Sequence, residues 1–330
     1  MDGKVVERTQ HTADASRSLT AMAALRDVTR YRQLAILTTV GVCLLTVAGG
    51  IVRLTGSGLG CDDWPNCNSE RFVDVSSGHA AIEQVNRLLS GVIGVPTVLL
   101  AISAFRVRPR VIGLRWPAIG VLVSVLANGV VGGVAVRTDL HPALVQSHFL
   151  LAMVSVAFGI VAVHRSSSSA SQAGRTTSWR SQPGQLTALL TSLTAVALVT
   201  GTVVTGTGPH AGEQNVRRFG FDISNVARIH SATVITALAV AGLLAWTLRS
   251  GADSEAGVRA ALSGWIFFGL LQSAVGYTQY FNGVPELLVG THIALATGLW
   301  VMTMRLLLMT IETRQPECNT KMMLPTAARV

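Results

Sequence analysis

Two pairs of polar residues occupy matching places in two apolar regions of the chain, and three of the four residues are histidines. His230 and His292 are separated by the same number of residues as Asn86 and His148. The residues around both ends also match in register, which predicts a duplicated unit. An imidazole in a membrane helix is costly unless it has a partner, and two histidines on two helices can hold haem iron. The pattern therefore favours haem binding, although a buried histidine can instead simply hydrogen-bond to a neighbouring helix.

The two halves differ beside these positions, and the difference carries chemical information. The first half has Glu83, Asn86 and Arg87 where the second half has alanine, histidine and serine. His230 and His292 would form a closed bis-His site that is suited to electron transfer. The first half has a carboxylate one helical turn from Asn86, which could move protons or fix a substrate. Glu83 and Arg87 are four residues apart, so they could also simply pair with each other.

Two cysteines flank a short polar segment after the first apolar stretch. Cys61 and Cys67 are expected on the outer side of a membrane, where disulfides form, so a disulfide is predicted. Two free thiols, or half of a metal site with His79 as a further ligand, are the alternatives. Cys43 lies within an apolar stretch and is expected to be a small core residue.

The composition is that of an integral membrane protein. Apolar residues make up 49% of the chain and charged residues only 13%. Stretches long enough to cross a bilayer occur at about 34–55, 81–105, 113–136, 142–164, 185–206, 224–248, 260–281 and 285–310. They predict an all-α integral membrane fold, with eight transmembrane helices in two pseudo-symmetric four-helix bundles. The polar N-terminal stretch lacks the apolar core and cleavage site of a signal peptide.

The positions of lysine and arginine predict the orientation. Most of the 26 basic residues fall in alternate loops and in the two tails. This distribution predicts a multi-pass protein of the plasma membrane with both termini in the cytoplasm. The net charge of +9 is explained by this topology and favours anionic lipid headgroups. No nucleic-acid partner is needed to account for the charge.

Several motifs match the order and spacing of one known family. Residues 53–61, with the Asp-Trp-Pro at 63–65 and Cys67, form a glycine-rich outer loop with two cysteines. Residues 83–87 follow in the second span, residues 201–212 at the exit of the fifth, and residues 279–292 around the last hairpin. Together these segments resemble the haem A synthase family of the cytochrome oxidase assembly pathway. The resemblance covers nearly all of residues 33–310.

The resemblance implies an oxidoreductase that oxidises the C8 methyl group of haem O to a formyl group, giving haem A for cytochrome oxidase. It implies a haem b cofactor whose iron is ligated by His230 and His292. It places the substrate haem near Glu83, which would be catalytic, and near His148 as an iron ligand. The family's histidine in the second span is Asn86 here, a poor iron ligand. The substrate would then bind through His148 alone or with another sixth ligand.

This reading divides the chain into five segments. The tails and the linker are cytoplasmic, the N-terminal half holds the substrate haem site with the outer cysteine loop, and the C-terminal half holds the haem b site. The segments are the N-terminal tail 1–32, the N-terminal half 33–164, the linker 165–184, the C-terminal half 185–310 and the C-terminal tail 311–330. Outer arginines could bind haem propionates: Arg53, Arg87, Arg137, Arg217, Arg218 and Arg228.

The implied partners are haem O as substrate, haem O synthase, cytochrome oxidase assembly proteins, membrane lipid, and quinone or another electron acceptor. The alternative function is a quinone-linked dihaem b-type electron-transfer cytochrome that modifies no haem. A haem-binding assembly factor without catalysis is a further alternative. The asymmetry at Glu83 and Asn86 favours the enzyme over the electron-transfer cytochrome.

Overall fold

The structure is a computed structural model, and it describes residues 3–107, 113–167, 175–177, 179–210, 212–213, 215–249 and 256–314. Its elements are α1 (Gly3–Leu54), α2 (Gly78–Arg106), α3 (Arg115–Arg137), α4 (Pro142–Arg165), β1 (Arg175–Thr177), α6 (Gln182–Thr207), α7 (Ile223–Leu248), α8 (Ala256–Phe281), α9 (Glu286–Ile311) and β2 (Glu312–Arg314). Eight helices in this part of the chain are long and apolar enough to cross a membrane. The predicted all-α membrane fold is confirmed.

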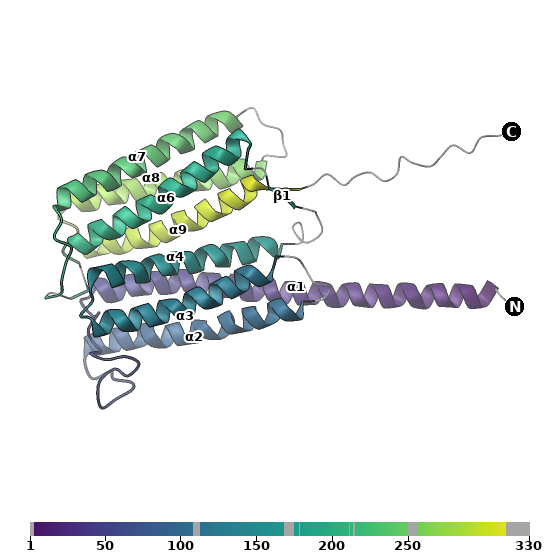
Figure 1. Cartoon of the computed structure of the whole chain (residues 1–330), viewed down its shortest axis with the longest axis horizontal. Coiled ribbons are helices and arrows are strands. Elements are labelled where there is room, and N and C mark those ends of the chain that lie inside the picture. Colours follow the sequence, from purple (N-terminus) through teal and green to yellow (C-terminus); the bar gives the residue numbers. More distant parts are fainter. Residues whose placement is uncertain are drawn as a thin grey trace.

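The first helix is longer than the sequence predicts. Its apolar part covers Asp27–Leu54, but the helical backbone begins at Gly3, and α1 extends well beyond the bundle in Figure 1. Residues 3–26, within the predicted N-terminal tail, therefore continue the first helix in one piece. The predicted C-terminal tail after residue 314 lies outside the described residues.

The helices associate in the same way in each half. In the N-terminal half, α1 contacts α2 and α4, and α3 contacts α2 and α4. In the C-terminal half, α6 contacts α7 and α9, and α8 contacts α7 and α9. The two sets lie one above the other in Figure 1, with α4, α1 and α9 at the boundary between them. This pairing is consistent with two pseudo-symmetric four-helix bundles.

Polar side chains mark the starts of three helices. Ser77, Ser181 and Asp222 each accept a hydrogen bond from a backbone amide three residues later, at the starts of α2, α6 and α7. Such caps satisfy amides that have no partner within the helix. The Ser224 hydroxyl and the Asn225 amide hold the pKa of the Asp222 carboxyl below its usual range.

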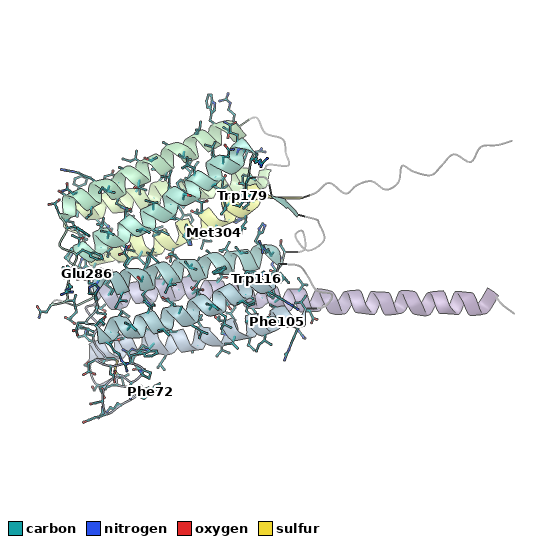
Figure 2. All side chains as sticks on the ribbon, viewed as in Figure 1. Phe72, Phe105, Trp116, Trp179, Glu286 and Met304 are labelled. Carbon is teal, nitrogen blue, oxygen red and sulfur yellow. A yellow bond between two sulfur atoms is a disulfide. The ribbon has the colours of Figure 1, made fainter. Side chains whose placement is uncertain are left out.

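Apolar side chains cover the outside of the bundle, as lipid contact requires. Leu44, Val92 and Leu126 are all more than half exposed in the middle of their helices. Phe105, Trp116 and other side chains stand out from one end of the bundle in Figure 2. Aromatic residues gather where a membrane meets water, so that end fits the interface.

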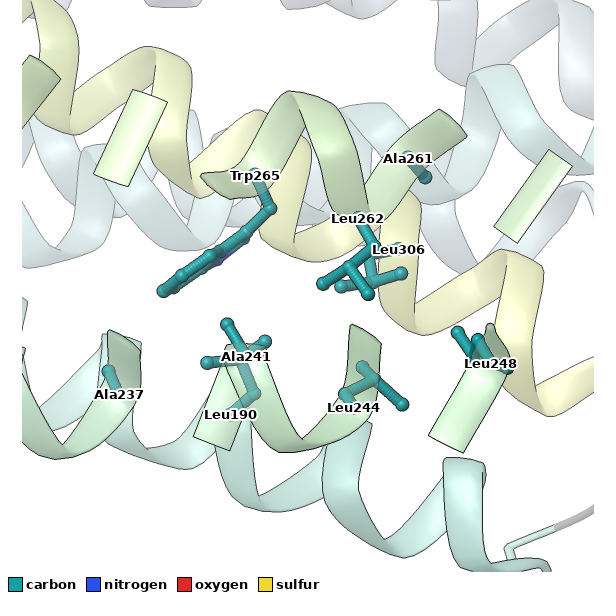
Figure 3. Close-up of a cluster of buried hydrophobic side chains, with 9 residues drawn as sticks. All are labelled: Leu190, Ala237, Ala241, Leu244, Leu248, Ala261, Leu262, Trp265 and Leu306. Atoms are coloured by element: carbon teal, nitrogen blue, oxygen red, sulfur yellow. The ribbon is translucent and has the colours of Figure 1, made fainter. Parts of the chain in front are cut away.

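Two of the clusters of buried side chains join helices around a tryptophan. One lies within the C-terminal half, where Trp265 packs with leucines and alanines of α6, α7, α8 and α9 (Figure 3). Trp265 Nε1 also donates a hydrogen bond to Thr303 Oγ1 at 2.9 Å. The other cluster joins the two halves, and in it Trp300 Nε1 on α9 donates to the Met153 carbonyl on α4 at 2.8 Å. These indole bonds fix the depth of α9 against α8 and α4.

Two short strands form the only sheet in the described residues. β1 and β2 pair in antiparallel fashion, with Arg175 opposite Arg314. β1 belongs to the predicted linker 165–184, most of whose first half lies outside the described residues. The pairing joins the linker to the end of α9.

Candidate functional site

Three partly buried imidazoles present the same free nitrogen. The Nδ1 atom of His148 on α4 lies 3.0 Å from the carbonyl oxygen of Asn128 on α3. The Nδ1 atom of His230 on α7 lies 3.0 Å from Thr200 Oγ1 on α6. His292 on α9 has a buried Nδ1 that completes no hydrogen bond in the described part of the chain. No described residue hydrogen-bonds to Nε2 of any of the three, so Nε2 is available to a ligand.

The two C-terminal histidines are placed as the predicted shared site requires. His230 and His292 lie in the same four-helix half, close enough to interact electrostatically. Two imidazoles on two helices of a bundle can serve as axial ligands of one haem. Among the described residues, no three His, Cys, Asp or Glu side chains cluster as they would around a bare metal ion.

The fourth position of the repeat is polar without being an imidazole. The Oδ1 atom of Asn86 on α2 is buried and has no hydrogen-bond partner in the described structure. The side-chain oxygens of Asn128 on α3 and Gln272 on α8 are buried and unpartnered in the same way. Unpaired polar atoms are costly in an apolar interior unless a bound group meets them. These atoms, beside His148 and His292, fit sites that a ligand completes.

Glu83 is the centre of a buried polar network on α2. Its Oε1 accepts hydrogen bonds from Arg87 Nη2 at 2.6 Å and Arg87 Nε at 3.1 Å, and its Oε2 accepts from the Cys61 amide at 2.8 Å. Arg87 Nη1 donates in turn to the carbonyls of Asp63 and Asn66. The ion pair between Glu83 and Arg87, which the sequence analysis gave as the alternative role of Glu83, is thus formed. It anchors the outer loop between α1 and α2.

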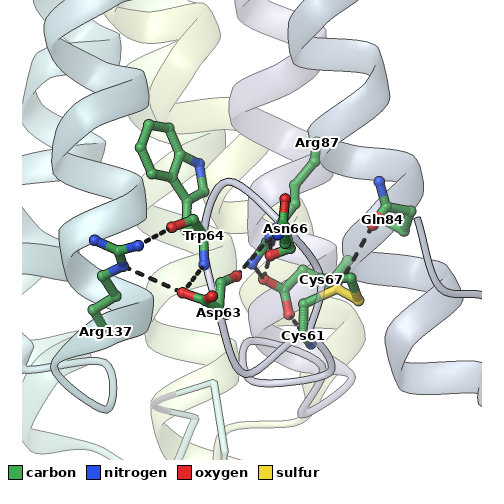
Figure 4. A network of polar contacts seen from close by, with 9 residues as sticks. Cys61, Asp63, Trp64, Asn66, Cys67, Gln84, Arg87 and Arg137 are labelled. Atoms are coloured by element: carbon green, nitrogen blue, oxygen red, sulfur yellow. Dashed lines mark hydrogen bonds and ion pairs between the residues drawn. A yellow bond between two sulfur atoms is a disulfide. The ribbon is translucent and has the colours of Figure 1, made fainter. Parts of the chain in front are cut away.

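The outer loop is closed by the predicted disulfide. Cys61 and Cys67 are bonded, and both are almost fully buried. Figure 4 shows the loop held from two sides, by Arg87 on α2 and by Arg137 on α3. Arg137 Nε lies 3.3 Å from Asp63 Oδ1, and its Nη2 donates to the Trp64 carbonyl. The loop is therefore a fixed structure over the outer end of the N-terminal half.

Trp64 brings the outer loop into contact with α3 close to His148. Its indole lies so close to Gly133 on α3 that a β-carbon there would clash with the ring. The preceding residue, Gly132, lies against the His148 imidazole. The loop and the imidazole thus contact the same turn of α3. No equivalent disulfide exists among the described residues of the C-terminal half, so this cover distinguishes the two halves.

Outer arginines are largely engaged with backbone carbonyls. Arg53 donates from Nη2 to the Thr205 carbonyl at 2.8 Å and from Nε to the His210 carbonyl. Arg218 donates to the Gly208 carbonyl. The two bonds of Arg53 join the end of α1 to the last turn of α6 and to the loop that follows it. The binding of haem propionates by outer arginines stays a prediction, and the bonds give several of these residues a structural role.

The sequence reasoning missed the residues that support the site. Trp64 belongs to the Asp-Trp-Pro motif and Arg137 to the outer arginines, and only the folded loop brings the two residues together. Gly132 and Gly276 could have been found, because they occupy equivalent places in the repeat, like His148 and His292.

Comparisons with known proteins agree with these features. The COX15-CtaA family, described as cytochrome oxidase assembly protein, matches residues 32–79 and 70–304. A protein of Geobacillus kaustophilus (strain HTA426) named heme A synthase is 31% identical over 121 residues, which are 36% of this chain and 38% of that protein. A protein of the same name from Bacillus cereus (strain AH187) is 33% identical over 125 residues, 38% of this chain and 40% of that protein. The chain thus matches about two fifths of the length of these curated relatives.

Proposed function

This chain belongs to the COX15-CtaA family of cytochrome oxidase assembly proteins, and we propose on that premise that it oxidises haem O to haem A. The reaction would convert the C8 methyl group of the substrate to a formyl group through successive hydroxylations. The enzyme would thus be an oxidoreductase of a plasma membrane, with both termini in the cytoplasm. Its partners would be a haem O synthase, cytochrome oxidase assembly proteins and an electron acceptor such as quinone.

The observation that carries the proposal is the inequality of the two halves. The C-terminal half presents two imidazoles with free Nε2 atoms, His230 and His292. The N-terminal half presents one imidazole, His148, together with the unpartnered amide of Asn86 and the carboxylate of Glu83. A closed site suits a resident electron carrier, whereas a site with one firm ligand suits a group that is bound, changed and released.

In the C-terminal half, His230 and His292 would hold a haem b. When bound, that group would supply one-electron transfer. The chain's own contribution is to hold the His230 imidazole in one orientation through the hydrogen bond between its Nδ1 and Thr200 Oγ1. A hydrogen bond on the far nitrogen fixes the tautomer and orientation of a ligating imidazole.

In the N-terminal half, His148 would bind the substrate haem, and Asn86 and Arg87 would line the site. We assign the catalytic role to Glu83. Its carboxylate accepts hydrogen bonds from Arg87 on Oε1 and from the Cys61 amide on Oε2, so a proton taken up by Glu83 would weaken the contacts that hold the outer loop. Catalysis and anchoring of the outer loop would then be coupled through one side chain.

The test is co-expression of the chain with a source of haem O, followed by chromatography of the extracted haems. Haem A or a hydroxylated haem O, made by the wild type and absent from cells with the empty vector, is expected. Haem B together with unchanged haem O would favour the dihaem electron-transfer cytochrome. Absence of any copurifying haem from the protein would contradict both haem sites.

A further inference from the structure

Each of the three imidazoles lies against a glycine on the preceding helix, which forms a hairpin with the helix that carries the histidine. The pairs are Gly132 with His148, Gly201 with His230 and Gly276 with His292. A β-carbon on these glycines would lie 2.8, 3.1 and 2.9 Å, respectively, from the imidazole Cε1 atom. In all three pairs Nδ1 is nearer to the glycine than Nε2 is. The three rings therefore turn the same edge toward the neighbouring helix.

The same edge faces a backbone carbonyl one helical turn before the glycine. The carbonyls belong to Asn128, Ala197 and Gln272, each four residues before its glycine. His148 completes this bond at 3.0 Å, whereas His292 interacts with the Gln272 carbonyl and its Nδ1 completes no hydrogen bond in the described structure. A helical side chain leans toward the N-terminus and covers the preceding turn. A glycine leaves that carbonyl uncovered, and the imidazole edge takes the space.

This contact determines which nitrogen carries the proton. A carbonyl oxygen only accepts hydrogen bonds, so the Nδ1 that bonds to it must be the donor. At His230 the acceptor is Thr200 Oγ1, whose own hydrogen points to the Val196 carbonyl at 2.9 Å. That hydroxyl therefore accepts a hydrogen bond from Nδ1, which carries the proton of the ring. At His148 and His230, Nε2 therefore keeps its lone pair, and in all three pairs it lies farther from the glycine than Nδ1 does.

We propose that these three glycine notches, each a glycine with the carbonyl four residues before it, are positioning elements that present His148, His230 and His292 as Nε2 ligands. The inference rests on the proposed function in one respect, since the ligand would be haem iron. Gly132 and Gly276 are equivalent in the repeat, whereas Gly201 lies on a different helix of its half. The same arrangement thus occurs in two structural settings.

The chain offers a matched test in the C-terminal half. Gly201→Ala and Gly276→Ala would each place a methyl group against an imidazole. Gly242→Ala on α7 is the control, because a β-carbon there meets nothing within 4 Å. Alanine is otherwise the better helix former, so helix propensity alone would favour all three changes. Haem content, haem affinity and the low-spin electron paramagnetic resonance signal would be measured on the purified full-length proteins.

Supporting residues of metal ligands typically contribute a factor of about 10–100 to metal affinity, so a loss of that size is expected in both notch variants and not in Gly242→Ala. Wild-type haem affinity and an unchanged low-spin signal in the notch variants would overturn the proposal. If these variants do not accumulate, Thr200→Val provides a second test, because it removes the hydroxyl that accepts a hydrogen bond from His230 Nδ1. This variant should shift the low-spin signal, and an unchanged signal would again overturn the proposal. A wild-type protein without low-spin haem would instead contradict the proposed cofactor site.

Discussion

Replacing Glu83 by alanine should release the outer loop as well as stop the proposed oxidation. The carboxylate accepts two hydrogen bonds from Arg87 and one from the Cys61 amide. All three are lost in the variant, and Arg87 keeps only the carbonyls of Asp63 and Asn66. The change therefore removes the bond between α2 and the Cys61 amide, at the point where the disulfide loop begins, and weakens the hold of Arg87 on the rest of the loop.

The size of the effect follows from the burial of the pair. Removing one partner of a buried ion pair costs about 3–5 kcal/mol. The lower value applies here, because the Arg87 side chain is 16% exposed and retains two carbonyl acceptors. A cost of about 3 kcal/mol corresponds to a rise on the order of 100-fold in the fraction of molecules with an open loop, since 1.4 kcal/mol is a factor of ten.

Disulfide reduction measures this opening directly. Cys61 and Cys67 are each 1% exposed, so a membrane-impermeant reductant should act only on the open loop, and its rate should rise by the same factor. Glu70→Gln, an exposed change in the same loop, is the control and should leave the rate unchanged. An unaltered reduction rate in Glu83→Ala would refute the anchoring argument. Haem A formation at the wild-type rate by that variant would refute the catalytic assignment.

Three further outcomes are expected. Changing His230 or His292 to alanine should abolish or shift the low-spin haem b spectrum, and two single variants with unchanged spectra would contradict the ligand assignment. Asn86→His should add a second low-spin haem signal in protein loaded with substrate haem, and it should slow the oxidation several-fold. The absence of this second signal would show that the substrate haem lies out of reach of position 86. Alkylation of unreduced, freshly isolated membranes followed by mass spectrometry should leave Cys61 and Cys67 unmodified, and labelling of both would exclude the disulfide.

The membrane fold could be predicted because lipid contact imposes a simple rule on sequence. Every predicted span became a helix, since backbone groups within a bilayer must be paired inside the segment. The helical extension over residues 3–26 was not predicted, because a polar helix outside the membrane has no hydropathy signal. The pairing of β1 with β2 joins segments far apart in the chain, and no local pattern indicates it.

The candidate site was predictable where partners are near in sequence or repeated. Glu83 and Arg87 lie one turn apart, and the cysteine pair lies within one short loop. The contact of Arg137 with Asp63 and Trp64 depends on how α3 meets the loop, which only the three-dimensional structure gives. The axial histidines, the haem b and the catalytic role of Glu83 stay predictions.

The contacts between the halves have the form of an isologous dimer interface. α4 contacts its repeat equivalent α9, and the contact of α1 with α9 is matched by that of α6 with α4. The chain is thus built as two subunits joined by a covalent linker. Two identical subunits cannot differ at one position, because a single gene change alters both. Fusion of the two halves into one chain removes that restriction. Asn86 and His230 occupy equivalent positions in the repeat, so one half can keep an imidazole there while the other half has an amide.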